Sequence, residues 1–185
     1  MNSTDEKIIQ LSKTKIALGI LGSFAFVAIG VWLIMLDQTN IETSRSFRLF
    51  FNSPTVVRGL GLVAIVVFGF LAIFFIRKLF DQKPGLVFNN AGIVDNASAV
   101  AAGFIPWSEV TGSHVFEIQR QKMLIIMVSD PQKYVDHGNA LKRKLNQANY
   151  KMCGSPIAIS ANALKVNFSE LRAIFDEYQQ KYGNA

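Results

Sequence analysis

Residues 16–36, IALGILGSFAFVAIGVWLIML, contain no charged side chain and decide the fold of this chain. A helix rises about 1.5 Å per residue, so a run of this length matches the roughly 30 Å hydrocarbon core of a bilayer. Twelve of its residues are Ile, Leu, Phe or Val, and each of these favours insertion by about 0.3 to 0.6 kcal/mol at the bilayer centre. We therefore predict a transmembrane helix over residues 16–36, preceded by an N-terminal tail over residues 1–15.

A second apolar run follows over residues 59–76, GLGLVAIVVFGFLAIFFI. Arg58 precedes it, and Arg77 and Lys78 follow it. An arginine at mid-bilayer would cost about 2.5 to 3.5 kcal/mol, so these side chains belong at the membrane boundaries. We predict a second transmembrane helix over residues 59–76 and hence a two-helix hairpin.

Two features of the runs bear on how the hairpin is built. A cleaved signal peptide explains the first run poorly, because its apolar part usually has about 7 to 15 residues and is followed by a small-residue cleavage site. Gly19 and Ser23 lie on one face of the first helix, and Gly61 and Gly69 on the second. Such residues permit close helix contact, although glycine is also simply frequent in membrane helices.

The composition supports a membrane protein. Half of the 185 residues are apolar and only 17% are charged, against about 25% in soluble domains. Neither apolar run contains an ionisable residue, which argues against a transport path through the hairpin. The single cysteine excludes an intrachain disulfide and a multi-cysteine zinc site.

The basic residues near the runs predict the orientation of the hairpin. Six of them flank its outer ends, and three lie in the connecting segment of residues 37–58. Because basic residues accumulate on the cytoplasmic side, we expect both termini in the cytoplasm and residues 37–58 outside it. The six are Lys7, Lys13, Lys15, Arg77, Lys78 and Lys83, and the three are Arg45, Arg48 and Arg58.

After the hairpin, residues 82–185 have the composition of a folded domain. Charges return, and glycine and asparagine separate short β-branched runs. The alternation of apolar residues and the turn signals predict a series of short strands, with a turn at Gln121 and Lys122 before the most apolar one. The expected strands are residues 85–89, 92–96, 104–107, 110–119, 123–128 and 157–160, with another short one over 164–166.

Two helices are expected among these strands. Asp130 and Pro131 form a helix start, and an apolar face of Tyr134, Leu141, Leu145 and Ala148 predicts one helix from Pro131 to about Ala148. Asn167 and Glu170 form a capping pattern before a C-terminal amphipathic helix. Its apolar face consists of Phe168, Leu171, Ile174, Phe175, Tyr178 and Tyr182. The order of elements predicts an α+β domain with helices on an antiparallel sheet.

The segment GFIPWSEV, residues 103–110, resembles the pattern of bacterial PH-like domains, and so do the final strand and C-terminal helix over residues 154–182. The layout as a whole resembles a group of bacterial inner-membrane proteins with a membrane hairpin followed by such a domain. This resemblance implies a bent antiparallel sheet closed at one end by the C-terminal helix. The helix from Pro131 departs from a minimal PH fold, as an inserted element.

One stretch imitates an enzyme motif. Asn89-Asn90-Ala91-Gly92 matches the signature of short-chain dehydrogenases. Those enzymes also need a glycine-rich dinucleotide turn well upstream, and here that region is occupied by the tail and the first apolar run. A hairpin turn explains the motif better.

The remaining chemistry-bearing residues form no cluster in the sequence. His114 and His137 lie far apart, and Asp136 and His137 diverge by about 100° on a helix. Cys153 has Lys151 nearby, which leaves a reactive thiol open as a minor alternative. We therefore expect no enzymatic activity, no catalytic residues, no cofactor and no metal.

The densest charge cluster is Lys142, Arg143 and Lys144. In the later turns of a helix, these cations would stabilise its negative C-terminal end. The alternative is contact with anionic lipid or with a partner. Nucleic acid is not expected, because aromatic and basic residues do not interleave on one surface.

These observations favour a membrane-anchored, non-enzymatic binding or scaffold module at the cytoplasmic face of a bacterial inner membrane. Its partner is expected to be a protein or an anionic lipid. The alternative is an immunity or inhibitor protein that neutralises a toxin or enzyme. The sequence leaves the oligomeric state open.

Overall fold

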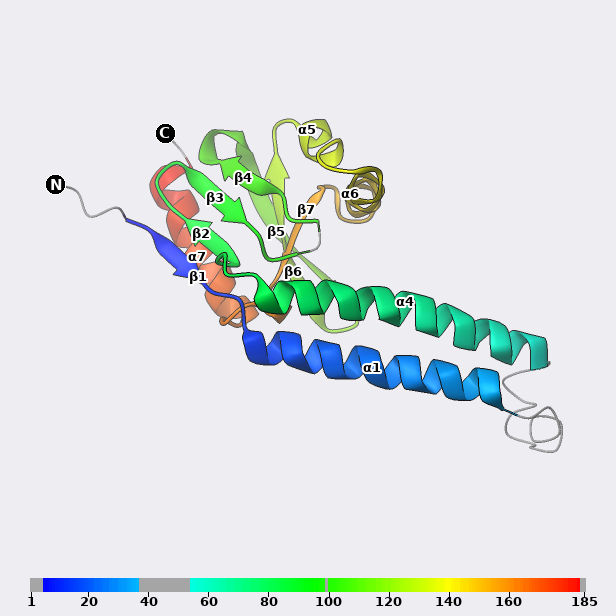
Figure 1. Ribbon diagram of the computed structural model, residues 1–185. Helices are drawn as coiled ribbons and strands as arrows, with labels where there is room; N and C mark the ends of the chain where they lie inside the picture. The colour runs from blue at the N-terminus through cyan, green and yellow to red at the C-terminus, as the bar shows by residue number, and fades with distance from the viewer. Residues whose placement is uncertain (1–4, 37–53, 99, 184–185) are drawn as a thin grey trace. The chain divides into compact units, whose positions relative to one another are not determined.

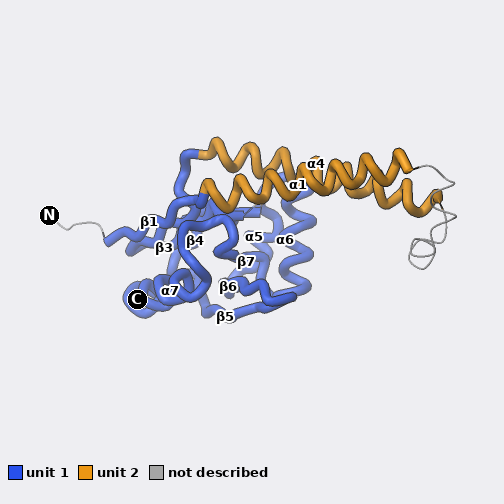
Figure 2. Tube along the Cα trace, turned by 90° about the horizontal axis from the view of Figure 1, so that it is seen from below, with its two compact units in different colours: residues 1–12, 82–185 blue, residues 13–81 orange. Residues whose placement is uncertain are grey.

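The computed structural model describes residues 5–36, 54–98 and 100–183. The chain forms two compact units, shown in Figure 2. One consists of residues 13–81, and the other joins residues 1–12 to residues 82–185. Most of the predicted extracytoplasmic segment, residues 37–53, lies outside the described residues.

The first unit is a pair of long helices, α1 (Lys13–Met35) and α4 (Pro54–Phe80) (Figure 1). Both are long and apolar enough to cross a membrane. Most of their apolar side chains are exposed, with Leu21 at 66% and Phe70 at 69%. A core helix of a soluble protein would bury such residues. The helix α4 begins before the predicted run, at Pro54, and includes Arg58 in its first turns.

The two helices approach each other closely at Gly30 and Gly61. A Cβ atom at Gly30 would lie 2.8 Å from the carbonyl oxygen of Gly61, so neither position has room for a side chain. The rings of Phe26 and Phe68 stack beside them, with centroids 4.3 Å apart. Of the small residues noted in the sequence, Gly61 makes this contact and Gly19 lies against the ring of Phe75 in α4, whereas a Cβ atom at Gly69 would have nothing within 4 Å.

The open end of the hairpin is closed by a lysine. Lys13 Nζ donates hydrogen bonds to the carbonyl oxygens of Leu79 and Asp81. A cation at the C-terminal end of a helix is stabilised by the helix dipole and by its unpaired carbonyls. Lys78 adds an ion pair with Asp81 at 3.1 Å. The two hydrogen bonds of Lys13 thus join the start of α1 to the end of α4.

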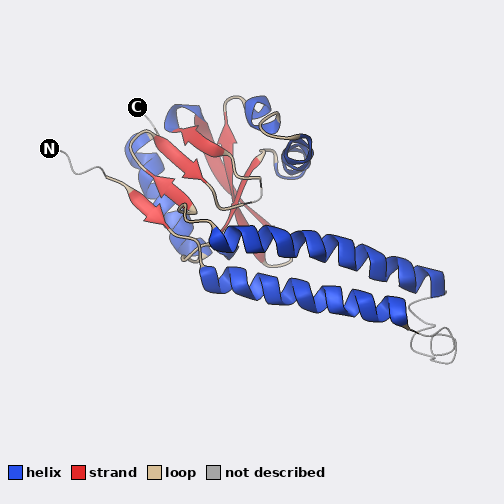
Figure 3. Cartoon of the chain, viewed as in Figure 1, coloured by secondary structure: helices blue, strands red, loops and turns tan. Residues whose placement is uncertain are grey.

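The second unit contains two antiparallel sheets (Figure 3). The first has the order β1-β2-β3-β4, and the second the order β5-β6-β7. Six of the strands were predicted from the sequence, and the apolar run over residues 123–128 lies in the central strand β6, as expected. The bounds are β1 (Lys7–Ile9), β2 (Leu86–Phe88), β3 (Gly92–Asp95), β4 (Gly103–Pro106), β5 (Val110–Ile118), β6 (Gln121–Val128) and β7 (Ile157–Ser160).

Strand β1 was not predicted, because its segment was interpreted as a tail. It pairs with β2 so that Lys7 faces Phe88 and Ile9 faces Leu86. Ile9 and the nearby Leu11 are buried. The segment is too short to show an alternating pattern, and its partner strand lies beyond both long helices in the sequence. Residues from both sides of the hairpin therefore build one sheet.

Two smaller predictions were wrong. The turn before β6 lies at Gln119 and Arg120, which have φ angles of 48° and 65°, and residues 121 and 122 are already in the strand. The strand expected over residues 164–166 is reduced to an isolated bridge between Leu164 and Leu11. A short 3-10 helix, Ala161–Ala163, precedes it.

The predicted helix over residues 131–148 is divided into α5 (Pro131–Val135) and α6 (Ala140–Cys153). Gly138 lies between them with a φ of +93°, a conformation that breaks a helix. Asn139 then starts α6, since its Oδ1 accepts a hydrogen bond of 2.9 Å from the backbone N–H of Lys142.

The C-terminal helix α7 (Phe168–Tyr182) confirms the prediction, including its capping box of Asn167 and Glu170. Its residues Leu171, Phe175 and Tyr178 are buried. The ring of Tyr178 contacts that of Phe88 in β2, with centroids 5.8 Å apart. The helix thus packs against the first sheet through Tyr178, and it also contacts β6 of the second sheet.

Candidate functional site on helix α6

The helices α5 and α6 are inserted between two strands that pair directly. β6 and β7 are antiparallel neighbours, and a hairpin of two to five residues ordinarily joins such strands. Here residues 129–156 make the connection instead, at the other end of the domain from α7 (Figure 1). The connection between β6 and β7 therefore does not require α5 and α6. These inserted helices are candidates for a functional role.

The insertion is fastened to the domain through Glu109. The Tyr134 hydroxyl donates a 2.9 Å hydrogen bond to Glu109 Oε2, and Lys133 Nζ donates to Oε1 at 2.6 Å. The contact with Lys133 holds the pKa of Glu109 below its usual value. Burial, together with the hydrogen bond to this carboxylate, raises the pKa of Tyr134. Glu109 is thus ionised and Tyr134 is neutral at neutral pH, and their hydrogen bond holds α5 against the rest of the domain.

The inner face of α6 is polar or small. Asn146 is buried, and its Nδ2 donates a 2.8 Å hydrogen bond to the carbonyl oxygen of Tyr134. Lys142 Nζ donates to the carbonyl oxygen of Ala101 at 2.5 Å. Cys153 is also buried, and desolvation raises the pKa of its thiol. A buried thiol with a raised pKa is poorly reactive, which argues against the reactive-thiol alternative.

The outer face of α6 is apolar and exposed. Leu141 is 60% exposed, Leu145 42% and Met152 51%, and Ala148 is exposed as well. In the sequence, Leu141, Leu145 and Ala148 predicted a helix with one apolar face, and in the structure this face is exposed. A helical period identifies which residues share a face, but not which face packs against the domain. We call Leu141, Leu145, Ala148 and Met152 the apolar stripe.

The basic cluster lies at the start of α6. Because the helix begins at Ala140, Lys142, Arg143 and Lys144 occupy its first turns, where the helix dipole disfavours cations. The explanation that they stabilise a helix C-terminus was therefore wrong. The structure also divides the cluster, since Lys142 is half-buried and bonded to Ala101, whereas Arg143 and Lys144 are exposed.

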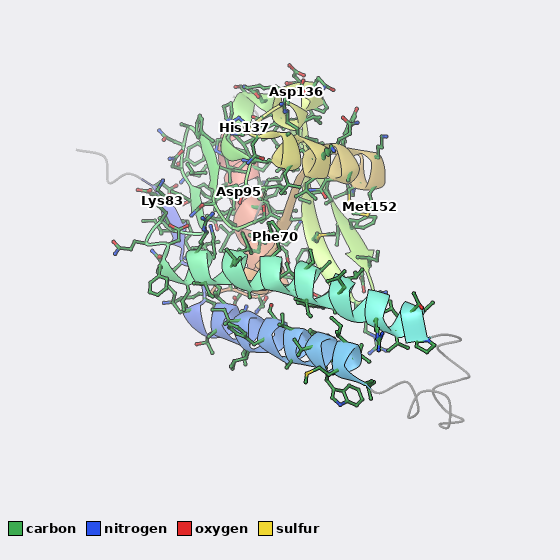
Figure 4. All side chains as sticks on the ribbon, turned by 45° about the vertical axis from the view of Figure 1, so that its right-hand side comes forward. Phe70, Lys83, Asp95, Asp136, His137 and Met152 are labelled. Atoms are coloured by element: carbon green, nitrogen blue, oxygen red, sulfur yellow. The ribbon has the colours of Figure 1, made fainter. Side chains whose placement is uncertain are left out.

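Lys151 was noted in the sequence only as a neighbour of Cys153 and was not grouped with the basic cluster. It lies in the last turn of α6 and is exposed. Successive helical residues are about 100° apart, so Lys144 and Lys151 project on the same border of the apolar stripe. The helical wheel would have revealed this alignment if the helix had been extended to Cys153. Figure 4 shows Met152, the last residue of the apolar stripe, at the C-terminal end of α6.

The two histidines do not form a site. Both His114 and His137 are exposed, and Asp136 accepts a hydrogen bond of 2.8 Å from Gln132 Nε2. Figure 4 shows Asp136 and His137 near the junction of α5 and α6. Within residues 5–36, 54–98 and 100–183, no group of three His, Cys, Asp or Glu side chains is placed to hold a metal ion.

The dehydrogenase-like motif forms a turn between β2 and β3. Asn89 Oδ1 accepts hydrogen bonds from the backbone N–H groups of Ala91 and Gly92, at 2.9 and 3.0 Å. A Cβ atom at Gly92 would lie 2.2 Å from the carbonyl oxygen of Ile105. Glycine is required there by the close approach of β4, so a structural role accounts for the motif.

Comparison with protein-family models, with curated proteins and with solved structures finds no match to this chain.

Proposed function

We propose that this chain is a membrane-anchored, non-enzymatic binding or scaffold module that presents a PH-like domain at the cytoplasmic face of a bacterial inner membrane. The helices α1 and α4 are its anchor in this proposal, and α6 presents its contact surface. The resemblance to bacterial inner-membrane proteins is what favours that membrane.

The observation that carries the proposal is the pairing of β1 with β2. Strand β1 precedes α1, and strand β2 follows α4. The backbone N–H of Gly85 also donates a 2.9 Å hydrogen bond to the carbonyl oxygen of Ile9. If both helices cross a bilayer, this sheet forms only when both ends of the hairpin lie on the same side. The basic residues at those ends favour the cytoplasmic side.

The arrangement of the domain also supports a PH-like fold. It consists of antiparallel sheets of four and three strands with a C-terminal helix. Trp107, from the segment that carries the resemblance, contacts Phe175 in that helix, with ring centroids 5.9 Å apart. A contact between this segment and the C-terminal helix is compatible with a PH-like domain that this helix closes at one end. The insertion of α5 and α6 is the departure from that pattern.

A non-enzymatic role is supported by the contacts of the side chains whose pKa values are shifted. The tyrosines with raised pKa values, Tyr134 and Tyr178, each donate a hydrogen bond to a carboxylate on another segment, Glu109 and Asp5 respectively. Perturbed groups often mark catalytic clefts, but structural networks perturb pKa values in the same way. Here they join chain segments.

The topology is tested with single introduced cysteines in a Cys153→Ala background. Native Cys153 is not used as the probe, because it is buried and would label poorly. Glu6→Cys and Ser169→Cys are exposed positions on the two sides of the hairpin, and Ser44→Cys lies in the connecting segment. We expect an impermeant maleimide on intact cells to label position 44 alone. Labelling of position 6 or 169 but not of 44 would contradict the proposal.

Binding is tested by placing a photo-crosslinking amino acid at Leu145 on α6 and at Gln180 on α7, both exposed, in the full-length protein in cells. We expect an adduct with protein or with lipid from position 145, identified by mass spectrometry, and none from 180. Adducts from neither position would count against a binding module that uses α6. A single toxin or enzyme captured at 145 would instead favour the immunity or inhibitor alternative.

A further inference from the structure

We propose that the outer face of α6 is a membrane-docking surface for anionic lipid, with the apolar stripe entering the headgroup region and Lys144 and Lys151 binding lipid phosphates. This inference rests on the proposed function, because the membrane anchor supplies the bilayer. It adds the identity of the occupant and the residues that contact it.

The helix α6 turns polar side chains towards the domain and leaves its apolar stripe exposed. An amphipathic helix in a soluble domain turns its apolar face inward. In α6 the inner face carries Lys142 and Asn146, which bond to backbone carbonyls, and the apolar stripe is exposed. Asn146 holds the helix in this orientation through Tyr134, so the exposure of the stripe is built into the domain.

The charge of α6 is complementary to an anionic surface. No acidic residue occurs in α6, whereas four basic residues do. Within the described part of the chain, Arg143, Lys144 and Lys151 make no ion pair. Arg143 and Lys144 also lie where the helix dipole disfavours cations. An anionic surface would compensate this charge, and the fold itself does not.

The pattern of apolar and basic residues on α6 matches a membrane surface as the partner. A helix that lies in a membrane interface combines an apolar face with lysine or arginine along its border, and it needs anionic lipid for part of its affinity. Lys144 and Lys151 border the stripe on one side, as that geometry requires. The linkers between α1 or α4 and the adjacent strands are short, so a tethered domain would experience a high effective concentration of lipid.

The test uses the full-length protein in nanodiscs, with Cys153→Ala and one cysteine carrying an environment-sensitive fluorophore. Leu145→Cys reports on the stripe, and Gln180→Cys on α7 is the matched exposed control. The discs contain either phosphatidylcholine alone or a mixture with phosphatidylglycerol, each doped with lipid that bears a nitroxide quencher at the interface. We expect stronger quenching at 145 than at 180 in the anionic discs, and less at 145 in the neutral discs or at high salt.

The basic residues are tested in the same assay. Lys144→Gln with Lys151→Gln should lower the ratio of docked to free domain by roughly fivefold for each residue. Lys122→Gln with Lys165→Gln removes the same charge from exposed positions outside α6 and should leave the quenching unchanged.

Two outcomes would overturn the inference. One is equal quenching at 145 and 180 in the anionic discs, and the other is quenching at 145 that does not depend on lipid charge. A protein adduct at 145 with no lipid quenching would reject the lipid while the binding module stands. The cysteine topology experiment tests the anchor separately, so failure of the anchor and failure of the docking surface are distinguishable.

Discussion

The indole ring of Trp107 packs against the phenyl ring of Phe175, with centroids 5.9 Å apart and planes inclined by 54°. Both side chains are buried, and Trp107 Nε1 donates a 2.8 Å hydrogen bond to the carbonyl oxygen of Asn89. The indole thus joins the C-terminal helix to the turn between β2 and β3. Tilted aromatic pairs of this kind contribute about 0.5 to 1.5 kcal/mol beyond their burial.

Phe175→Ala is expected to lower the free energy of unfolding of the domain by about 3 to 5 kcal/mol, because the change leaves a cavity beside Trp107. The reaction of buried Cys153 with a maleimide dye on heating the full-length protein reports this unfolding. Phe168→Ala is the control, since Phe168 begins the same helix but is only half-buried. An unchanged midpoint for Phe175→Ala would reject this packing.

The contribution of β1 predicts which fragments fold. A fragment of residues 83–185 lacks Ile9 and Leu11, both buried, and leaves β2 as an unpaired edge. We expect it to be unfolded or molten by circular dichroism. A fusion of residues 1–12 to residues 82–185 through a short Gly-Ser linker should fold, because the Gly85 N–H contacts the Ile9 carbonyl oxygen.

Leu11→Ala in that fusion tests how much the N-terminal segment contributes to the free energy of unfolding. It should cost about 2 to 5 kcal/mol, as expected for a fully packed leucine. Ile8 is 50% exposed, so Ile8→Ala should have a much smaller effect on the same chemical-denaturation curve. Equal stability of the fusion and the 83–185 fragment would show that β1 is dispensable.

Elements encoded by local patterns were predictable from the sequence. The capping box at Asn167 and Glu170 placed α7, and the uncharged runs placed α1 and α4. Strand β1 was not predictable in this way, because three residues carry no measurable period and the pairing is made with residues beyond both long helices. Its stability depends on tertiary contacts, such as those of Leu11 with Leu164.

The candidate site was predicted only in part. The stripe residues Leu141 and Leu145 were grouped correctly, but the period of a helix does not specify which side packs inward. That choice depends on Asn146 and Lys142, whose partners are backbone carbonyls of distant segments. The helix break at Gly138 places Lys142, Arg143 and Lys144 at the start of a helix and not in its later turns. The helix dipole therefore disfavours these cations, whereas the sequence had suggested that it would stabilise them.

The hairpin contact makes a prediction about glycine. Gly30→Leu would place a side chain against the backbone of Gly61, at an approach of 2.8 Å for the first atom alone. Close packing drives association of helices in lipid, so this change should separate α1 from α4. Gly22→Leu is the matched control on the same helix, because nothing lies within 4 Å of its Cβ position.

Heating in detergent followed by size-exclusion chromatography measures the effect. We expect the monodisperse peak of the Gly30→Leu protein to disappear at a lower temperature than that of the wild type and of Gly22→Leu. Identical behaviour of the two variants would argue against the Gly30–Gly61 contact.

The divided basic cluster predicts opposite effects on stability. Lys142→Met removes the hydrogen bond to Ala101, so it should destabilise the domain by about 1 to 3 kcal/mol. Arg143→Gln with Lys144→Gln relieves unfavourable charge at the start of α6 and should leave stability unchanged or raise it by up to about 1 kcal/mol. Thermal unfolding of the full-length protein in detergent distinguishes these outcomes. A stability loss in the Arg143 and Lys144 variant would restore a structural role for these residues.

The N-terminal segment is also held by an ionic contact at Asp5, which predicts a dependence on pH. Asp5 accepts hydrogen bonds from the hydroxyl groups of Tyr178 and Tyr182, at 3.0 and 2.8 Å, and pairs with Lys181. The contact with Lys181, followed by those with the two tyrosines, lowers the pKa of Asp5 to about 2 from its ordinary 3.8. The folded state therefore favours the ionised carboxylate.

Linkage determines the direction of the effect. Because the pKa is lower in the folded protein, the stabilisation is fully present above the ordinary value of 3.8 and is lost as the pH falls towards about 2. Asp5→Asn should reduce the thermal midpoint at neutral pH, and the difference from the wild type should shrink across that acidic window. The contact is solvent-exposed, so the reduction should be modest.

The control for this effect is Glu6→Gln, which removes the same charge one residue away. Glu6 is exposed and does not take part in the contact with Lys181 and the tyrosines, so its replacement should leave the wild-type pH profile in place. Added salt should weaken the Asp5 effect, because the pair with Lys181 is screened. A difference between Asp5→Asn and the wild type that stays constant from neutral pH down to about 2 would mean that the carboxylate contributes through its shape alone, and the ionic contact between the N-terminal segment and α7 would be rejected.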